Sequence, residues 1–201
     1  MFGTVPRVRD RRDKFMNDNM KSIAILATPL LLCTSLPVVV KAGPPRPISS
    51  ISHEAQKDYE AAVTFTDQGQ PDKAIREYRL ALKADPTYAP SHSNLGALLD
   101  DKGQVAEAIR ECRLAVKLSP KSSAMHDNLG SVLGDASLYD EAIRECQYAL
   151  ALDRHNGKAH LNLGVLYYNM HQRDKARVEW QQAIKVGDSK VKEMALNFLA
   201  H

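Results

Sequence analysis

Residues 92–99 read HSNLGALL, and the same pattern returns as HDNLGSVL at 126–133 and as HLNLGVLY at 160–167. The copies lie 34 residues apart, and this period runs from residue 55 to residue 190 without an insertion. Small residues recur at positions 8, 20 and 27 of the unit: Ala62, Gly96, Gly130 and Gly164; Ala74, Ala108, Ala142 and Ala176; Ala81, Ala115, Ala149 and Ala183. A fixed period of this length is typical of proteins built from stacked repeats.

Apolar spacing within one unit predicts two helices. In the second unit, one helical face carries residues with i, i+3, i+4, i+7 spacing: His92, Leu95, Gly96 and Leu99. Gly103 breaks this helix, and Pro120 stops the next one because proline cannot donate a helical hydrogen bond. The second helix is expected to turn these residues to its apolar side: Ala108, Cys112, Leu114, Ala115, Val116 and Leu118. Helices of only about 14 residues need stacked neighbours to bury enough surface.

This pattern resembles the tetratricopeptide repeat, whose consensus W-x2-L-G-x2-Y, Ala, Phe, Ala, Pro has the same period. The resemblance implies an all-α fold, a right-handed α-solenoid of four helical hairpins. The repeats are predicted at 55–88, 89–122, 123–156 and 157–190, of which the first is degenerate. Residues 191–201 are expected to form a capping helix that covers the last hairpin, with Trp180 packed beneath it.

The first 42 residues are predicted to be an export signal. An uncharged run, SIAILATPLLLCTSLPVVV, follows Met20 and Lys21. Val40 and Ala42 supply the small residues that a signal peptidase reads, so we expect cleavage after Ala42 and a periplasmic or secreted mature protein. The translation start is either Met1 or Met20.

The N-terminus also has features of other targeting signals. The apolar run is long enough to span a bilayer, so an inner-membrane anchor formed by residues 23–40 is the alternative to cleavage. Lys14 argues against a twin-arginine signal at Arg11 and Arg12, and Leu32 argues against a lipoprotein signal at Cys33.

Net positive charge is concentrated near the N-terminus. Residues 1–42 carry seven Lys or Arg and three acids, which leaves 20 basic and 21 acidic residues for 43–201. This near-neutral remainder gives no electrostatic support for nucleic-acid binding, which needs a clustered positive face. Residues 43–54 begin with GPPRPISSIS and are predicted to be a flexible linker.

The recurring histidines and cysteines are predicted to be structural. Equivalent positions of stacked repeats lie roughly 10 Å apart, so His92, His126 and His160 cannot share a zinc ion, whose ligand nitrogens lie about 2 Å away. In the family, histidine at this position fills space and makes a local hydrogen bond. Cys112 and Cys146 are likewise one repeat apart, too far for a disulfide, and are predicted to be buried thiols. No catalytic motif is present, so we expect no enzyme activity, no cofactor and no metal.

The asparagines at position 6 are the candidate binding groups. Asn94, Asn128 and Asn162, the asparagine row, fall on the opposite face of the first helix, which in this family lines the concave groove. A side-chain amide offers one acceptor and two donors, so a row of three could hold an extended peptide backbone. The row resembles the asparagine ladders of the O-linked N-acetylglucosamine transferase superhelix and kinesin light chains. The alternative is that these amides only make local hydrogen bonds.

The remainder of the groove is expected to have an acidic rim and one apolar end. Asp67, Asp101 and Asp135 share position 13, where solvated helix ends are the alternative interpretation. Tyr59 and Val63 stand where chaperone-binding repeats have the first lysine and asparagine of their carboxylate clamp, so we expect no such clamp. The predicted binding residues are Tyr59, Asn94, Asp101, Asp127, Asn128, Asp135, Lys158, Leu161, Asn162, Val165, Tyr168 and Asn169.

Together these patterns predict a non-catalytic scaffold that binds a partner protein or an extended peptide with basic and apolar side chains. We expect no nucleic-acid partner and no small-molecule substrate. A place in the bacterial envelope is suggested by fold analogy alone. The alternatives are a membrane-anchored subunit of a multiprotein complex and a regulatory subunit of an enzyme on another chain.

Overall fold

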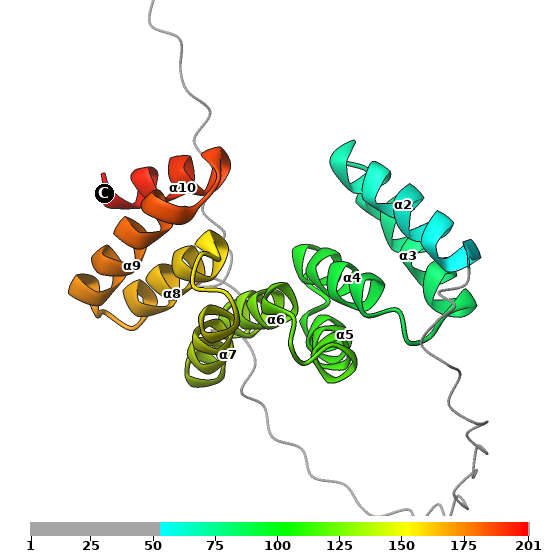
Figure 1. The fold of residues 1–201 in the computed structure, drawn as a ribbon, viewed down its shortest axis with the longest axis horizontal. Coiled ribbons are helices and arrows are strands. Elements are labelled where there is room, and N and C mark those ends of the chain that lie inside the picture. The colour runs from blue at the N-terminus through cyan, green and yellow to red at the C-terminus, as the bar shows by residue number, and fades with distance from the viewer. Residues whose placement is uncertain (1–52, 201) are drawn as a thin grey trace, which may run out of the picture. The chain divides into compact units, whose positions relative to one another are not determined.

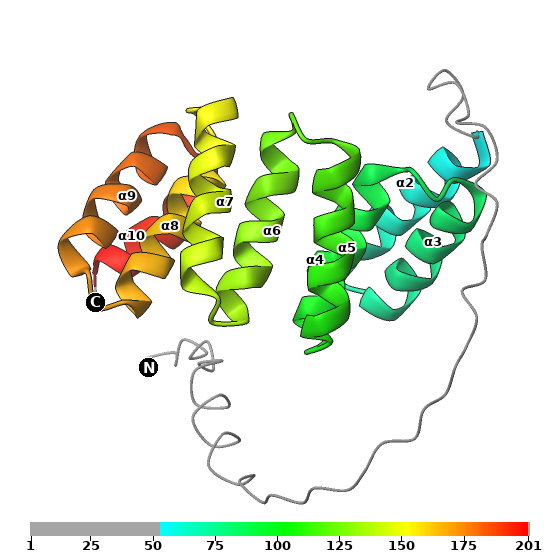
Figure 2. The same cartoon turned by 90° about the horizontal axis from the view of Figure 1, so that it is seen from below.

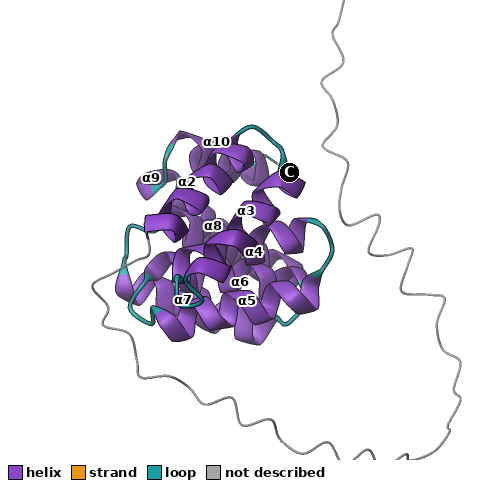
Figure 3. Cartoon of the chain, turned by 90° about the vertical axis from the view of Figure 1, so that its right-hand side faces the viewer, coloured by secondary structure: helices purple, strands orange, loops and turns teal. Residues whose placement is uncertain are grey.

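The computed structural model describes residues 53–200, which form helices and connecting turns and no strand (Figures 1 and 3). The helices are α2 (His53–Asp67), α3 (Pro71–Ala84), α4 (Ala89–Asp101), α5 (Val105–Leu118), α6 (Ser123–Asp135), α7 (Tyr139–Leu152), α8 (Gly157–Asn169), α9 (Arg173–Val186) and α10 (Ser189–Leu199). The predicted export signal and residues 43–52 of the linker lie outside the described residues. None of the helices in this part of the chain has the length and hydropathy needed to cross a membrane.

Consecutive helices pair as four hairpins, and each hairpin packs on the next (Figure 2). The first helices of neighbouring hairpins also contact one another directly, α4 with α6 and α6 with α8. Figure 1 shows these helices on the inner side of a curved stack and α5, α7 and α9 on its outer side. We therefore call α2, α4, α6 and α8 the inner helices and α3, α5, α7 and α9 the outer helices. The all-α solenoid predicted from the repeat is confirmed.

Each hairpin turns at position 15 of its repeat through a backbone with positive φ. Gly69 and Gly103 adopt φ values of 68° and 77°, which glycine tolerates without a steric penalty. In the third and fourth hairpins Ser137 and His171 hold the same conformation, each at φ 61°. The tight turn is therefore a property of the repeat, and two of the four turns accept the strain of a side chain there.

Small residues let the two helices of a hairpin approach closely, as the sequence predicted. The alanines at positions 20 and 27 are fully buried. A Cβ atom added to Gly130 would lie 2.5 Å from Cys146 Sγ and 3.2 Å from the Ala142 carbonyl oxygen. Gly96 faces Cys112 and Gly164 faces Trp180 in the same way. In these three repeats glycine at position 8 leaves room for the side chain at position 24, whereas the first repeat has Ala62 and Tyr78 at the two positions.

The cysteine prediction is confirmed. Cys112 and Cys146 are free and completely buried. Burial raises the pKa of the Cys112 thiol to about 12 and that of Cys146 further still, with nearby carboxylates adding to both shifts. Both side chains therefore fill space as neutral thiols.

Leu114 was expected on the buried side of α5, and this expectation was wrong. Its side chain is 36% exposed, and Leu80 and Tyr148, at the same position of neighbouring repeats, are 47% and 51% exposed. Position 26 faces outward because the buried stripe of each outer helix is narrow, consisting mainly of the residues at positions 20, 24 and 27.

The last helix covers the final hairpin. It begins at Ser189, two residues before the predicted start, because the Asp188 carboxylate accepts a hydrogen bond from the Val191 N–H at 2.9 Å and caps the helix. Trp180 stacks on Phe198 with ring centroids 5.0 Å apart, so the predicted packing of Trp180 beneath this helix is confirmed. The cap shields an apolar end that a solenoid would otherwise expose.

Candidate peptide-binding groove

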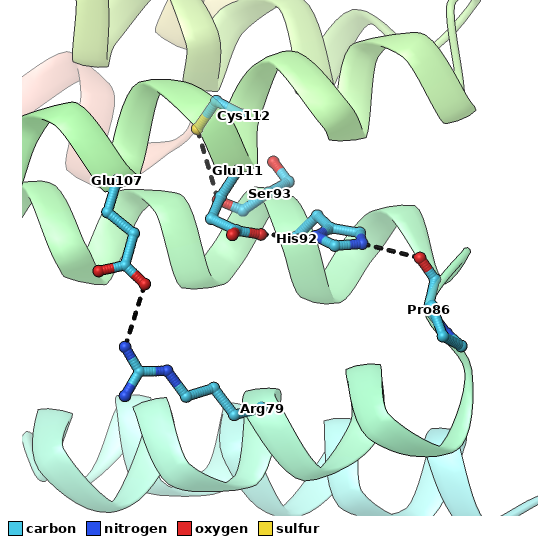
Figure 4. A network of polar contacts seen from close by, with 7 residues as sticks. All are labelled: Arg79, Pro86, His92, Ser93, Glu107, Glu111 and Cys112. Atoms are coloured by element: carbon cyan, nitrogen blue, oxygen red, sulfur yellow. Dashed lines mark hydrogen bonds and ion pairs between the residues drawn. The ribbon is translucent and has the colours of Figure 1, made fainter. Parts of the chain in front are cut away.

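The histidines join the helices of a hairpin to the preceding repeat. His92 lies between Glu111 of α5 and the Pro86 carbonyl, with Nδ1 2.6 Å from Glu111 Oε2 and Nε2 3.0 Å from the carbonyl oxygen (Figure 4). Because a carbonyl oxygen only accepts, Nε2 carries the hydrogen. His92 is 6% exposed, and its local hydrogen bonding agrees with the structural role predicted for this position.

The other two histidines follow the same design. His126 Nδ1 lies 2.6 Å from Glu145 Oε2, and its Nε2 lies 3.0 Å from the Pro120 carbonyl oxygen. His160 Nδ1 lies 2.7 Å from Glu179 Oε2. No cluster of three potential metal ligands occurs among residues 53–200.

Ion pairs link neighbouring outer helices. Arg79 pairs with Glu107 at 3.2 Å (Figure 4), and Arg113 pairs with Glu141 at 2.8 Å. Both pairs join position 25 of one repeat to position 19 of the next. Their side chains are substantially exposed, so each contributes little to stability and serves mainly to align the repeats.

The asparagine row joins neighbouring inner helices. Asn128 Nδ2 donates to Ser93 Oγ at 2.7 Å, and Asn162 Nδ2 donates to Asp127 Oδ1 at 2.9 Å. Asn94 Nδ2 donates to the hydroxyls of Tyr59 and Tyr78, at 3.4 and 3.1 Å. In each case the acceptors include position 5 of the preceding repeat. The sequence left open whether these amides bond locally, and the structure assigns two such bonds to Asn94 and one each to Asn128 and Asn162.

These bonds engage only part of each amide. Asn128 and Asn162 each use one of two N–H donors in the bond to the preceding repeat, and all three side chains are partly exposed. The carbonyl oxygens of the amides are not used in these bonds. The row therefore links neighbouring repeats and still has unused hydrogen-bonding groups on the inner helices.

Asp127 is the predicted binding residue with the most unusual surroundings. It lies on α6, is 3% exposed, and accepts the Asn162 bond. Burial raises the pKa of its carboxyl to about 6, although the Asn162 hydrogen bond and the charge of Lys158 act in the opposite direction. The sequence placed Asp127 with the exposed acids of the groove, whereas position 5 is buried in the second, third and fourth repeats, at Ser93, Asp127 and Leu161.

The predicted acidic rim lies at the ends of the inner helices. Asp67, Asp101 and Asp135 are the last residues of α2, α4 and α6, and Asn169 is the last residue of α8. All four are exposed. Asp101 also lines an open depression of about 620 Å³ beside the turns of the first two hairpins. These acids have accessible carboxylates at one edge of the stack.

The apolar end of the predicted groove is only partly open. Leu161 is 5% exposed and belongs to a core cluster with Trp180 and Val191, so its side chain supports the cap instead of lining an open surface. Position 5 is also buried in the second and third repeats, where Ser93 and Asp127 are 1% and 3% exposed. Val165 and Tyr168 remain partly exposed, and Lys158 is exposed.

Charge differs between the two layers of helices. The inner helices carry eight acids and two lysines, whereas the outer helices carry nine acids and twelve Lys or Arg. The near-neutral total for residues 43–201 concealed this separation. Counting charges by predicted helix would have found it, because alternate helices lie on opposite layers of the stack.

Comparisons with known proteins agree on the fold. Family models match at residues 63–103, described as TPR repeat, and at 89–122 and 135–189, described as Tetratricopeptide repeat. A comparison with curated proteins gives no match.

Several solved structures are similar to the chain. MamA is 30% identical, with a TM-score of 0.54, over 63% of this chain and 74% of MamA. YrrB, described as a TPR protein with an unusual peptide-binding site, is 22% identical, with a TM-score of 0.60, over 73% and 75% of the two chains. The first TPR of Spaghetti bound to the HSP90 peptide SRMEEVD is 23% identical, with a TM-score of 0.56, over 60% and 95%. The repeats, the hairpin stack and these matches together establish that the chain belongs to the tetratricopeptide repeat family.

Proposed function

We propose that this protein is a non-catalytic scaffold that binds an extended segment of a partner protein along its inner helices. The observation that carries the proposal is the row of partly exposed amides at one-repeat spacing on an acidic layer of helices. Proteins of this family are generally scaffolds, and YrrB and Spaghetti, which share the fold, are described with a peptide-binding site and a bound peptide.

The surface favours a segment with basic and apolar side chains. Eight acids against two lysines on the inner helices attract cations. Val165 and Tyr168 offer apolar contact at the end nearest the cap. Amide groups between these regions pair with a peptide backbone irrespective of its sequence.

The test uses a degenerate peptide library and two matched triple variants. Asn94, Asn128 and Asn162 are replaced together by alanine, and in the control Arg76, Arg110 and Arg144 of the outer helices are replaced by alanine. We expect the asparagine variant to lose affinity for selected peptides about tenfold or more, and the arginine variant to bind like the unmodified chain. Circular dichroism shows whether each variant is folded.

Two results would count against the proposal. One is an asparagine variant that stays folded and binds the selected peptides as tightly as before. The other is an equal loss in both variants, which would place binding on no particular face. If the asparagine variant unfolds because the inter-repeat bonds are lost, the single variant Asn128→Ala is compared with Arg110→Ala in the same assay.

We further propose that the chain is exported, with cleavage after Ala42 and function in the periplasm or outside the cell. The small residues at Val40 and Ala42 after the apolar run support this assignment. Mass spectrometry of the mature protein measures its N-terminus directly. A mature N-terminus at Gly43 is the expected result, and recovery of residues 23–40 would favour the membrane-anchored alternative.

A further inference from the structure

Asp127 is enclosed without a paired cation. One carboxylate oxygen accepts from Asn162, and no described Lys or Arg forms an ion pair with the residue. The second oxygen has no hydrogen bond within residues 53–200. Among those residues, the fully buried side-chain atoms without a partner are Ser91 Oγ and Trp180 Nε1. The second Asp127 oxygen therefore retains some solvent-exposed area, although the residue as a whole is only 3% exposed.

Comparison with the other repeats shows that the charge is not needed for the inter-repeat bond. Ser93 and Tyr59 occupy the same position 5 and accept the equivalent asparagine bonds through neutral hydroxyls. A neutral acceptor at position 127 would therefore serve the stack equally well. Burying a carboxylate without a cation costs free energy, and this cost is incurred in the third repeat alone.

We propose that Asp127 determines the specificity of the groove by pairing with a lysine or arginine side chain of the bound segment. This inference rests on the function proposed above. A cation at the accessible oxygen would form a charge-assisted hydrogen bond in a largely dehydrated setting, where such bonds are strongest. The cation of the bound segment would supply the ion-pair partner that no described Lys or Arg provides to this carboxylate.

The neighbouring charged groups define how pH affects this contact. Lys158 on α8 acts on Asp127 without forming an ion pair, and Cys146 on α7 lies close enough for the Asp127 charge to raise the pKa of its thiol. Burial holds the pKa of Asp127 at about 6, so the carboxyl is partly neutral near pH 6 and ionised above it. A bound cation favours the ionised form, and affinity for a lysine peptide therefore rises with pH through this range.

Histidine side chains also change charge between about pH 5 and 8, so the pH profile of the unmodified chain does not identify Asp127 alone. A matched variant identifies the contribution of Asp127. Asp127→Asn keeps an oxygen that can accept the Asn162 bond and removes only the charge. Asp140→Asn makes the same change at an exposed position of the outer helix α7, outside the predicted binding residues, and serves as the control.

The experiment screens a degenerate peptide library in which one position is fixed in turn as lysine, arginine, norleucine or glutamate. The best lysine peptide and its norleucine analogue are then titrated against the purified chain and both variants. At about pH 7.5 we expect the unmodified chain and D140N to prefer lysine about tenfold or more, and D127N to lose that preference. The preference of the unmodified chain should shrink toward about pH 5, whereas D127N should show little change.

The outcomes separate the two proposals. If library peptides bind but lysine and arginine are not preferred, or if folded D127N keeps the preference, the inference about Asp127 is wrong and the scaffold proposal stands. If no library peptide binds the folded chain, both proposals fail. Loss of the preference in D140N as well as in D127N would assign it to the overall charge of the chain and also overturn the inference.

Discussion

At the scale of the residue, Asp127 is a buried carboxylate in the middle of the inner helices. It is 3% exposed, and desolvation is the largest influence on its pKa. An ionised carboxylate in such surroundings weakens the folded state whenever the pH lies above the pKa. The same residue is therefore a cost to stability and the candidate contact for a basic side chain.

Replacing this residue by asparagine is expected to stabilise the chain in a pH-dependent way. The folded pKa is about 6, above the ordinary value of 3.8. Between these values the folded state binds a proton that the unfolded state does not, so the free energy of unfolding rises as the pH falls from 6 toward 3.8. D127N should therefore be more stable by roughly 3 kcal/mol above about pH 7 and gain almost nothing near about pH 4.

Urea titrations at the two pH values measure this difference, with D135N as the exposed control. An equal gain for D127N at both pH values would contradict an origin in the charge of Asp127. A gain of similar size for D135N would also contradict it, because that carboxylate is already solvated.

At the scale of the helix pair, the hairpin depends on one contact between a glycine and the side chain at position 24. Cys112, Cys146 and Trp180 occupy this position in successive repeats, and each lies against the glycine at position 8. The same helix geometry thus accommodates a thiol or an indole opposite a glycine, and in the first repeat Ala62 and Tyr78 occupy the two positions.

Gly130→Ala is expected to destabilise the third hairpin by about 1–3 kcal/mol, because the new methyl group overlaps Cys146 Sγ. Removing that sulfur in the double variant G130A/C146A should recover part of the loss. The recovery is partial because the Ala142 carbonyl still lies 3.2 Å from the added atom. A double-mutant cycle in urea, with C146A as the second single variant, measures the coupling between the two sites.

Strict additivity of the two substitutions would show that the thiol and the glycine are energetically independent. A double variant that loses more stability than the two single variants together would also contradict the overlap. Either result would mean that the helices already move apart in G130A to relieve the contact.

Across the whole molecule, the stack separates its charges between layers and closes its apolar end with α10. The chain has a single tryptophan, Trp180, which lies under this cap. Its emission therefore reports on the docking of the last helix without any added label.

Phe198→Ala is expected to loosen the cap, because the ring of Phe198 stacks on Trp180 at 5.0 Å. We expect the free energy of unfolding to fall by about 1–3 kcal/mol and the emission of Trp180 to shift to longer wavelength. Leu196→Ala on the same helix is the control, since Leu196 is 55% exposed and its removal should change neither quantity measurably. A similar response to both substitutions would show that the aromatic stack does not hold the cap.

The sequence predicted the repeat, the helices and the buried small residues because each hairpin contacts only its neighbours and repeats the same local pattern. The burial of individual groove residues was predicted less well. Position 5 was predicted to line the groove, yet Ser93, Asp127 and Leu161 are buried at that position and Tyr59 is only partly exposed. Outward-facing Leu114 was misplaced for a related reason, because hydrophobicity alone does not show which side of a helix meets a partner.

The asparagine bonds have a consequence for how the chain can change in length. Residues 89–122 carry both halves of the inter-repeat bond, the acceptor Ser93 and the donor Asn94, as well as the Glu107 and Arg113 of the outer ion pairs. A tandem duplication of this segment would give each copy a complementary neighbour on both sides. Whole repeats can thus be gained in a single genetic event without new compensating substitutions, whereas an insertion of another length inside a helix would displace the bonding residues of that repeat from their partners.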